Sequence, residues 1–308
     1  MLAQTREVTR SQWREFLAWT HYQLQSYEVD GMYAELEKRT SQFPTAPGPL
    51  EVVEHDRRLA GAYLTIAPGR VAAVSGVRAL PEHTAHGPRI VRRLIEQASA
   101  AGATQIQAIV DRNSNQASDI LTAAGFQQMA ILKHLWLQLP RHESTETRQF
   151  NHGPLEFVPV SSFSRRRIEN LISSTFIDTL DCPAVNELRD PKCVLETFLD
   201  GQNPRMNIPW WIIQDHGAEI GCLFLNIHAE NVAELVYMGL AAQARGKGFG
   251  RKIVEAACHR CSTLGCTILV AAVDNRNLPA VHIYDRFGFQ THRELEAWFL
   301  TAASKQKP

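Results

Sequence analysis

The sequence predicts an α/β protein with mixed β-sheets, built as two tandem domains of one fold. Three observations predict it. Apolar runs with a period of two are interleaved with amphipathic runs of helical period. The order of these runs in the first half of the chain recurs in the second half. A length of 308 residues is also sufficient for two domains of ordinary size.

The first half opens with helical spacing, in which Trp13, Phe16 and Leu17 share one face. A proline-rich breaker at 43–49 separates this region from a three-stranded meander. The expected elements are helices over about 10–25 and 32–41, strands over 50–55, 58–66 and 70–78, a helix over 88–101, a strand over 104–110, a helix over 115–124 and a strand over 126–139.

The second half has the same order of elements. Trp210 and Trp211 stand at a strand start and alternate between its faces, so we expect one of them in the core. The expected elements are a strand over 155–160, helices over 161–175 and 190–200, strands over 208–214, 218–227 and 231–240, a helix over 250–264, a strand over 267–273, a helix over 278–287 and a strand over 289–300.

An internal repeat supports the tandem arrangement. A single constant offset in residue number aligns Gly125-Phe126-Gln127 with Gly288-Phe289-Gln290. The same offset pairs positions at turns and in the apolar pattern: Gly76 with Gly239, Gly87 with Gly250, Gly102 with Gly265, Asp111 with Asp274 and Ala117 with Ala280. We therefore expect a first domain over 1–142, a polar linker over 143–153 and a second domain over 154–308.

Composition narrows the function classes. Lys and Arg together number 32, as do Asp and Glu, so the formal net charge is zero. The overall charge therefore does not favour binding to nucleic acid or to an anionic membrane. The N-terminus has no signal-peptide pattern and no apolar run reaches the length of a membrane span, so we expect a cytoplasmic protein. Cys258 and Cys261 have helical spacing and no second Cys/His pair follows, so we expect no metal site.

A glycine-rich segment, residues 243–250, lies between a strand-like and a helical run. Gly246, Gly248 and Gly250 leave the backbone open to a ligand, and the helix that follows offers unpaired N–H groups. This pattern indicates a phosphate site. No Gly-Lys-Ser/Thr closes the segment and the Gly-x-Gly-x-x-Gly spacing is absent, so it is neither a P-loop nor a dinucleotide fingerprint.

The arrangement Arg245-x-x-Gly248-x-Gly250 resembles the pyrophosphate-binding motif of the GNAT acetyltransferases. A second motif of that family follows, Asn277-x-x-Ala280-x-x-x-Tyr284-x-x-x-Gly288-Phe289. The resemblance covers about residues 208–299. It implies acetyl-CoA as co-substrate and transfer of its acetyl group to a primary amine by direct attack, with a small molecule or a peptide as acceptor.

The resemblance also implies roles for particular residues. Backbone N–H groups of the glycine segment would hold the pyrophosphate, the main chain of the preceding strand would pair with the pantetheine arm, and Asn277 would bond the arm. Asn277 could also be only a helix N-cap. The implied cofactor-binding residues are Met238, Gly239, Leu240, Arg245, Gly246, Lys247, Gly248, Phe249, Gly250, Arg251 and Asn277.

Two residues are candidates for acid–base catalysis. The motif implies that Tyr284 protonates the departing thiolate, although a lone tyrosine on a helix could equally be a core residue. Glu234 occupies the strand position of the catalytic glutamate in histone-acetyltransferase members of the family, and the alternative to it is a chain of water molecules. Asp181, in the turn 179–183, could hold a cationic amine or only cap that turn.

The first copy lacks these groups. At the single offset, Glu82, His83 and Ala85 stand opposite Arg245, Gly246 and Gly248, with Leu121 opposite Tyr284 and Val71 opposite Glu234. We expect a degenerate first domain. The alternatives are a second phosphate site through His83 or His86, a non-catalytic acyl-CoA-binding or sensor module, and acyl transfer to an oxygen acceptor. The sequence leaves the oligomeric state open.

Overall fold

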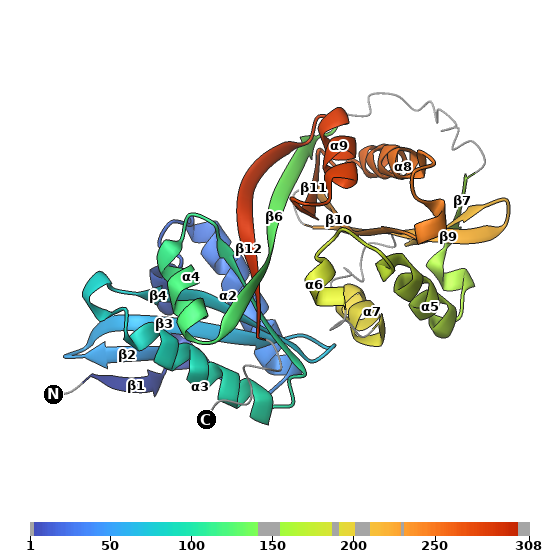
Figure 1. Ribbon diagram of the computed structural model, residues 1–308. Helices are drawn as coiled ribbons and strands as arrows, with labels where there is room; N and C mark the ends of the chain where they lie inside the picture. Colours follow the sequence, from blue (N-terminus) through green and yellow to red (C-terminus); the bar gives the residue numbers. More distant parts are fainter. Residues whose placement is uncertain (1–2, 141–154, 187–190, 201–209, 229–230, 301–308) are drawn as a thin grey trace. The chain divides into compact units, whose positions relative to one another are not determined.

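The computed structural model describes residues 3–140, 155–186, 191–200, 210–228 and 231–300 (Figure 1). The chain forms two compact units. Unit 1 takes in the chain up to Met129 and the segment from Leu295 onwards, and unit 2 is Ala130–Glu294. Among the described residues, no helix combines the length and apolar character needed to cross a membrane.

Unit 1 is a mixed sheet with helices on both faces. Its strand order is β1-β2-β3-β4-β5-β12, antiparallel except for the parallel pair β4–β5. The strands are β1 (Gln4–Glu7), β2 (Leu50–Glu54), β3 (Arg57–Ile66), β4 (Val71–Ala79), β5 (Gln105–Asp111) and the end of β12 (Gln290–Leu300). The helices are α1 (Trp13–Thr20), α2 (Ser26–Gln42), α3 (His86–Ala100) and α4 (Asn115–Ala123).

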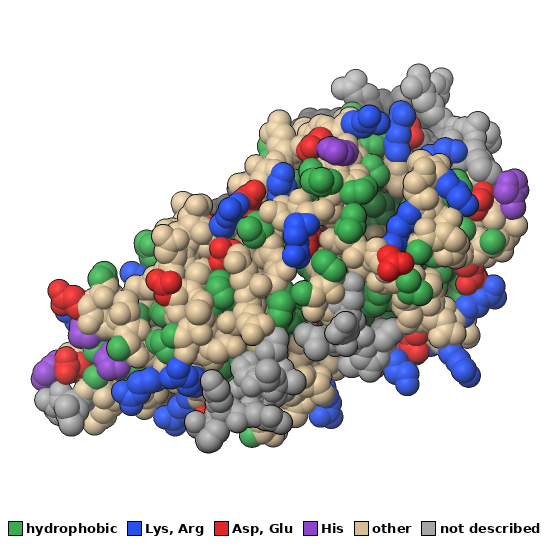
Figure 2. Space-filling view, in the orientation of Figure 1, with side chains coloured by type: hydrophobic (Ala, Val, Ile, Leu, Met, Phe, Trp, Pro, Cys, Tyr) green, Lys and Arg blue, Asp and Glu red, His purple; other side chains and the backbone are tan. Residues whose placement is uncertain are grey.

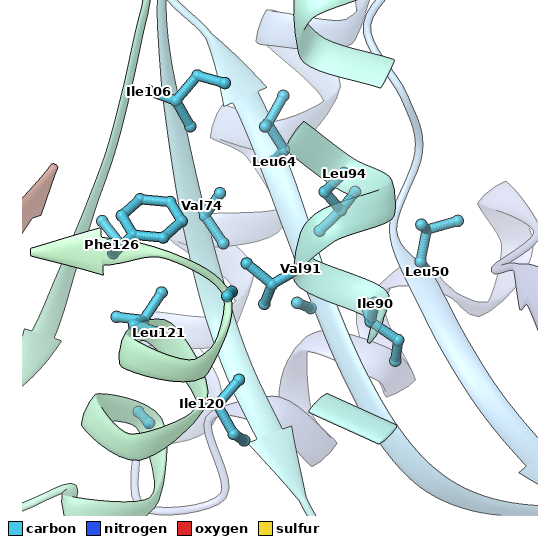
Figure 3. Close-up of a cluster of buried hydrophobic side chains, with 14 of the residues drawn as sticks. Leu50, Leu64, Val74, Ile90, Val91, Leu94, Ile106, Ile120, Leu121 and Phe126 are labelled. Carbon is cyan, nitrogen blue, oxygen red and sulfur yellow. The ribbon is translucent and has the colours of Figure 1, made fainter. Parts of the chain in front are cut away.

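The sheet of unit 1 has a core on each face. Helices α3 and α4 bury Ile90, Val91, Leu94, Ile120 and Leu121 against the strands (Figure 3). Their i, i+3 and i+4 spacing places these side chains on one stripe of each helix. The opposite face is covered by α1 and α2, whose buried side chains pack around Tyr63 of β3: Trp13, Phe16, Leu17, Val29 and Leu36.

Unit 2 has the same architecture. Its strand order is β6-β11-β10-β9-β8-β7, with β10 and β11 parallel and the other pairs antiparallel. The strands are β6 (Phe126–Gln138), β7 (Leu155–Pro159), β8 (Trp211–Asp215), β9 (Ala218–Ile227), β10 (Val232–Leu240) and β11 (Ile268–Asp274). The helices are α5 (Arg165–Phe176), α6 (Pro183–Asn186), α7 (Pro191–Asp200), α8 (Phe249–Thr263) and α9 (Leu278–Arg286).

Both faces of the unit 2 sheet are also buried. Helices α8 and α9 cover one core, and α5 and α7 cover the other. Strand β9 is therefore almost continuously apolar, because its side chains are buried on both sides. The two tryptophans divide as expected: Trp210 is buried and stacks on Phe224, with ring centroids 4.4 Å apart, while Trp211 packs against the core of the other face.

Two elements were not predicted, and one is shorter than predicted. Strand β1 carries mainly exposed polar side chains, so it has no period-two alternation of apolar residues. Helix α6 is only one turn long. The helix expected over 10–25 ends at Thr20, where the C-cap His21 leaves helical geometry with φ −115° and ψ 46°. The part of the strand 208–214 before Trp210 lies outside the described residues.

The repeat is visible in the element bounds. The bounds of α3 and α8, of β5 and β11, and of α4 and α9 are all related by the offset that takes Gly125 to Gly288. The two copies also make the same close helix contact. A Cβ on Gly87 would lie 2.5 Å from Ile120, and a Cβ on Gly250 would lie 2.9 Å from Ile283, the residue at the same offset. Glycine is needed there because the helices approach so closely.

The strands that precede these elements follow a different offset. The single constant offset expected from the sequence is therefore wrong for them. The bounds of β2 and β8, of β3 and β9, and of β4 and β10 are all related by an offset that is shorter by two, the one that takes Leu50 to Trp211. The copies therefore differ by a two-residue insertion after the fourth strand. The counterpart of Glu234 is Ala73 rather than Val71, and Gly76 is not the counterpart of Gly239.

The insertion falls in the glycine segment. The 3-10 turn Pro81–His83 is followed by its C-cap Thr84 and directly by Ala85, the N-cap of α3. In unit 2 the turn Ala242–Ala244 is followed by its C-cap Arg245, then by two further residues, and then by Gly248, the N-cap of α8. Thr84, not Glu82, is thus the counterpart of Arg245, and Gly246 and Lys247 have no counterpart in unit 1.

The last strand of each compact unit comes from the other half of the chain. Leu295–Phe299 of β12 pair with β5, and Trp298 and Leu300 lie in the core of unit 1. Leu132–Gln138 of β6 pair with β11, and Leu135 and Leu139 lie in the core of unit 2. The compact units therefore differ from the consecutive domains expected from the repeat, because the turn patterns that mark domain ends do not report strand pairing.

This exchange predicts how fragments behave. We expect residues 130–294 to give a soluble, cooperatively folding fragment, whereas 154–308 should aggregate. The second fragment lacks the β6 side chains of the core, leaves the edge of β11 unpaired and carries the apolar end of β12 without its core. Size-exclusion chromatography and thermal unfolding of both fragments test this. Equal solubility and equal melting temperatures of the two fragments would contradict it.

Candidate active site

The glycine segment of unit 2 has the backbone geometry of an open loop. Gly246 and Gly248 have φ of 75° and 80°, in the left-handed region that side chains disfavour. An added Cβ at either position would meet nothing within 4 Å, so packing does not require these glycines. Their conformation leaves the backbone of the loop accessible to a ligand.

The loop leads directly into the N-terminus of α8. Gly248 is the N-cap and has no side chain to accept from the first turn. Within the described residues, the backbone N–H groups of Gly246, Gly248 and Phe249 have no recorded acceptor. In unit 1, by contrast, Ala85 has φ −60° and the N–H of Gly87 donates to the carbonyl of Thr84. The two loops thus differ in backbone conformation and in the bonding of the Gly87 N–H, and the left-handed loop of unit 2 offers its backbone N–H groups to an anion.

Basic side chains surround this helix. Lys247 and Arg251 are exposed, and Lys252 follows on the first turn of α8. Figure 2 shows Lys and Arg side chains around apolar ones in the part of unit 2 that contains α8 and α9. Positive side chains and the positive end of the helix dipole both favour a phosphorylated ligand.

The side chain of Arg245 has a structural role that the sequence did not reveal. Its guanidinium group donates to three backbone carbonyls: Nε to Leu240 at 3.0 Å, Nη1 to Asp178 at 2.8 Å and Nη2 to Thr175 at 2.8 Å. These bonds join the glycine segment to the end of β10 and to the end of α5. The planar five-donor geometry of arginine suits this task, which lysine cannot perform.

Strands β10 and β11 separate next to the loop. Their parallel pairing covers Val232–Leu235 and Ile268–Ala271 and stops there, at a bulge of β10. Residues 236–240 then have β9 as their paired neighbour and, among the described residues, no ladder to β11. Met238, Gly239 and Leu240 lie on this segment, and the carbonyl of Leu240 accepts from Arg245 Nε.

Tyr284 lies on α9 in the core of unit 2. It is 4% exposed, and its ring contacts Phe289 edge to face at 5.0 Å between centroids. Burial raises the pKa of the phenol well above its usual value, and the negative charge of Asp181 raises it further. In the part of the chain that the structure describes, its hydroxyl has no hydrogen-bond partner, and the hydroxyl oxygen is not one of the fully buried polar atoms that lack one.

The equivalent position in unit 1 shows what packing alone requires. Leu121 is fully buried there and lies beside Phe126, the counterpart of Phe289 (Figure 3). An aliphatic side chain thus satisfies the core of this fold. The hydroxyl of Tyr284 is an addition that packing does not explain.

Asn277 caps the helix that carries Tyr284. Its side chain accepts from the N–H of Ala280 at 3.4 Å, and Leu278 next to it is exposed. The N-cap interpretation is therefore confirmed for Asn277. Nothing in the structure tests its expected bond to the cofactor arm.

The segment between α5 and α6 docks on the end of β11 through two aspartates. The buried carboxylate of Asp274 accepts from the N–H of Cys182 at 3.1 Å and from the Arg276 guanidinium at 2.7 Å. Burial opposes ionisation of Asp274, but the Arg276 hydrogen bonds outweigh it and lower the pKa. The N–H of Asp274 donates to Asp181 Oδ1 at 3.3 Å, which fixes that carboxylate beside the end of the strand.

Glu234 lies elsewhere along the sheet. It pairs with Val270, four residues before Asp274 on β11, so about 13 Å of strand separates the two levels. Its carboxylate is half-exposed and bonds to His228 Nε2 at 2.7 Å. This bond raises the pKa of His228, and Coulomb attraction adds to the shift.

The raised pKa of His228 predicts that its contact with Glu234 stabilises the fold in a pH-dependent way. A raised folded-state pKa means that the pair stabilises the fold fully below the unfolded value of about 6.5 and loses this effect as pH rises through the folded value. Glu234→Gln should therefore lower the pKa of His228, measurable from its Cε1–H resonance between about pH 5 and 9. Glu219→Gln, which removes a carboxylate paired with Arg167 instead, is the control. An unchanged His228 titration in Glu234→Gln would refute the pairing.

The chain is similar in sequence to known acetyltransferases. Residues 170–289 match the model of the Acetyltransferase (GNAT) family. A mycothiol acetyltransferase of Streptomyces bingchenggensis is 32% identical over 95 residues, 29% of this chain and 31% of the relative. One of Acidimicrobium ferrooxidans is 24% identical over 236 residues, 73% of each chain. The match spans about a third of the length of four such relatives.

Solved structures share the fold. A GCN5-related N-acetyltransferase from Sphaerobacter thermophilus has a TM-score of 0.60 at 13% identity, over 96% of this chain and 95% of that chain. A tandem GNAT protein from the clavulanic acid biosynthesis pathway has a TM-score of 0.54 at 14% identity, over 97% and 98%. Residues 170–289, which lie within unit 2, thus match the GNAT acetyltransferase family, and the chain as a whole shares its fold with these solved structures.

Proposed function

We propose that unit 2 is an acetyl-CoA-dependent N-acetyltransferase that acetylates a primary amine by direct attack. The observation that carries the proposal is the glycine loop of unit 2: its backbone donors at the start of α8 have no acceptor within the described residues, and a Cβ at Gly246 or Gly248 would meet nothing within 4 Å. The donor set fits a diphosphate, because each N–H can donate to a charged oxygen.

The remaining binding roles follow from the geometry. The backbone N–H groups of residues 246–251 would hold the pyrophosphate, since that of Arg245 already donates to the carbonyl of Ala242, and Lys247 and Arg251 would add positive charge. Arg245 would act as a positioning residue through its three carbonyl contacts. The main chain of Met238, Gly239 and Leu240 would bond the amides of the pantetheine arm, apart from the carbonyl of Leu240, which accepts from Arg245 Nε. Asn277 would contribute from the cap of α9.

The chemistry assigned to acetyl-CoA is the supply of an activated thioester carbonyl. The amine nitrogen forms a bond to that carbonyl carbon as the carbon–sulfur bond breaks. Tyr284 would donate its proton to the departing sulfur, because its hydroxyl has no partner among the described residues and packing does not require it. A chain of water molecules, or Glu234 reached through one, would accept the proton that the amine loses, since about 13 Å of strand separates Glu234 from the level of Asp274.

Unit 1 is proposed to be degenerate. Its loop is two residues shorter, its N-cap Ala85 is not left-handed and Leu121 replaces the tyrosine. The acceptor is proposed to be a small molecule with a primary amine. The matched relatives are named mycothiol acetyltransferases, which makes mycothiol-related amines the first compounds to assay.

The test is acetyl transfer by the intact chain. Purified protein, acetyl-CoA and a panel of amines are assayed for release of free thiol and, by mass spectrometry, for the acetylated product. Transfer to an amine supports the proposal. Binding of acetyl-CoA without any turnover would indicate an acyl-CoA-binding module, and transfer to hydroxyl compounds alone would indicate an oxygen acceptor.

A further inference from the structure

Strand β6 brings a histidine of the first repeat into unit 2. His134 pairs with Ala272 of β11, and the parallel pairing of β10 with β11 ends one residue earlier, at Ala271. A pantetheine arm that ran from the glycine loop along residues 240 to 238 would place its thioester near this point, where the strands begin to separate. His134 therefore lies only one strand, about 4.8 Å, from that part of β11.

His134 stands on the face of the sheet that also carries Glu234. Side chains alternate between the two faces along a strand, and Leu135 and Ala271 lie in the core beneath α8 and α9. His134 and Ala272 therefore belong to the opposite face. Ala272 is exposed and has only a methyl group, so the neighbouring side chain of β11 does not cover the imidazole.

The imidazole of His134 is not committed to a structural hydrogen bond within the described residues. Its Nδ1 is buried without a partner, and the ring contacts His292 edge to face at 6.1 Å between centroids. A buried polar atom without a partner is uncommon, so a structural role does not explain this histidine. Glu234, by contrast, is already bonded to His228 and pairs with Val270, further from the opening.

The charges around His134 keep it neutral near pH 7. Burial lowers its pKa from the ordinary value of 6.5, and the positive charges of Arg293 and His292 on β12 lower it further. Glu234 on β10 opposes them, and the facing residue of β11, Ala272, has no charge. A neutral imidazole has a lone pair with which to accept a proton.

We propose that His134 accepts the proton that the attacking amine loses. This inference rests on the proposed function of unit 2 and names the proton acceptor that it left open. As the nitrogen bonds to the thioester carbonyl carbon and the carbon–sulfur bond breaks, the proton of the nitrogen passes to the imidazole and the sulfur receives that of Tyr284.

The repeat gives this assignment independent support. The register of β6 on β11 and that of β12 on β5 make Ala297 the counterpart of His134 in unit 1. Packing at this position is therefore satisfied by a methyl group, and the unit without the glycine loop also lacks the base. His134 lies outside the matched residues 170–289, so similarity to the acetyltransferase family assigns it no role.

Two coenzyme A thioethers test the placement without knowledge of the natural acceptor. S-(2-aminoethyl)-coenzyme A puts an ammonium group close to the position of the attacking nitrogen, and S-propyl-coenzyme A is its uncharged analogue of similar size. The pKa of His134 is measured in the intact chain from its Cε1–H resonance, assigned by its loss in His134→Gln. The aminoethyl compound should leave this pKa about one pH unit lower than the propyl compound does, because a nearby positive charge disfavours the imidazolium.

His216, exposed in the turn after β8, is the internal control and should titrate alike with both thioethers. The same pKa of His134 with both bound thioethers would overturn its role and leave the proposed function standing. Failure of both thioethers to bind would instead contradict the cofactor site, and with it both proposals.

Kinetics with the amine found in the transfer assay test the role itself. His134→Gln should lower kcat by about 10²-fold or more and keep the affinity for acetyl-CoA. Arg293→Gln should move the acidic limb of the kcat/KM profile to higher pH, because it removes a positive charge that lowers the pKa of His134. Arg166→Gln, which removes an exposed charge on α5, is the matched control and should leave the limb in place. An unmoved limb in Arg293→Gln, or turnover of His134→Gln within a few-fold of the original, would overturn the role of His134.

Discussion

Removal of Gly246 and Lys247, combined with Gly248→Ala, is expected to abolish acetyl-CoA binding and to leave the fold intact. The variant reproduces the loop length of unit 1, in which α3 begins directly after Ala85. The fold therefore tolerates the shorter loop. Loss of two charged hydrogen bonds from the loop backbone would weaken binding by at least about a hundredfold.

Calorimetry measures the loss of affinity, and circular dichroism with thermal unfolding checks the fold. Lys247→Ala is the matched control, since it keeps the loop backbone and removes only an exposed charge, which should weaken binding by about threefold or less. A shortened variant that binds acetyl-CoA within about threefold of the original protein would show that the loop is only a turn between a strand and a helix.

Tyr284→Phe should lower turnover by about 10²–10⁴-fold, the usual contribution of a general acid. The melting temperature should change little, because the ring keeps its contact with Phe289 and the hydroxyl has no partner in the described residues. Acetyl-CoA affinity should also be retained. The measurement is steady-state kinetics with the amine found in the transfer assay.

A second variant separates chemistry from packing. Tyr284→Leu reproduces the residue found at the equivalent core position of unit 1, Leu121. It should fold and should be as inactive as Tyr284→Phe. Turnover of Tyr284→Phe within a few-fold of the original enzyme would make the tyrosine a packing residue.

Much of the fold could be predicted from the sequence, because it is encoded locally. Helix α9 has its cap Asn277 and its apolar stripe close together in the chain, and β5 and β11 are short apolar runs that each end in an aspartate. Periodicity and capping report such elements directly. The glycine loop and Tyr284 could be named as candidates for the same reason, since their motifs are contiguous.

The remaining features depend on contacts between distant residues. Neither the strand exchange of β6 and β12 nor the guanidinium contacts of Arg245 leave a periodic signal. The single offset taken from Gly125 and Gly288 also concealed the insertion of Gly246 and Lys247, because matches on one side of the gap dominated the alignment. The shorter offset across the strands, read from the meander turns, would have revealed it.

Asp181 illustrates the same limit. In the sequence it is an aspartate in a turn before a proline, a pattern that usually marks a cap. Its position at the end of β11 arises from the docking of the turn on Asp274, which is far away in the sequence. The one signal available in the sequence was that an aspartate recurs at equivalent positions of the two repeats, 111 and 274. Each of these carboxylates accepts from the N–H two residues ahead.

The stoichiometry of acetyl-CoA binding to the intact chain tests the central claim most directly. Isothermal titration should give one site per chain, located by its loss in the shortened-loop variant, because only unit 2 has the two inserted residues and the left-handed N-cap Gly248. Two equivalent sites per chain would show that unit 1 also binds the cofactor, and no binding at all would contradict acetyl-CoA dependence.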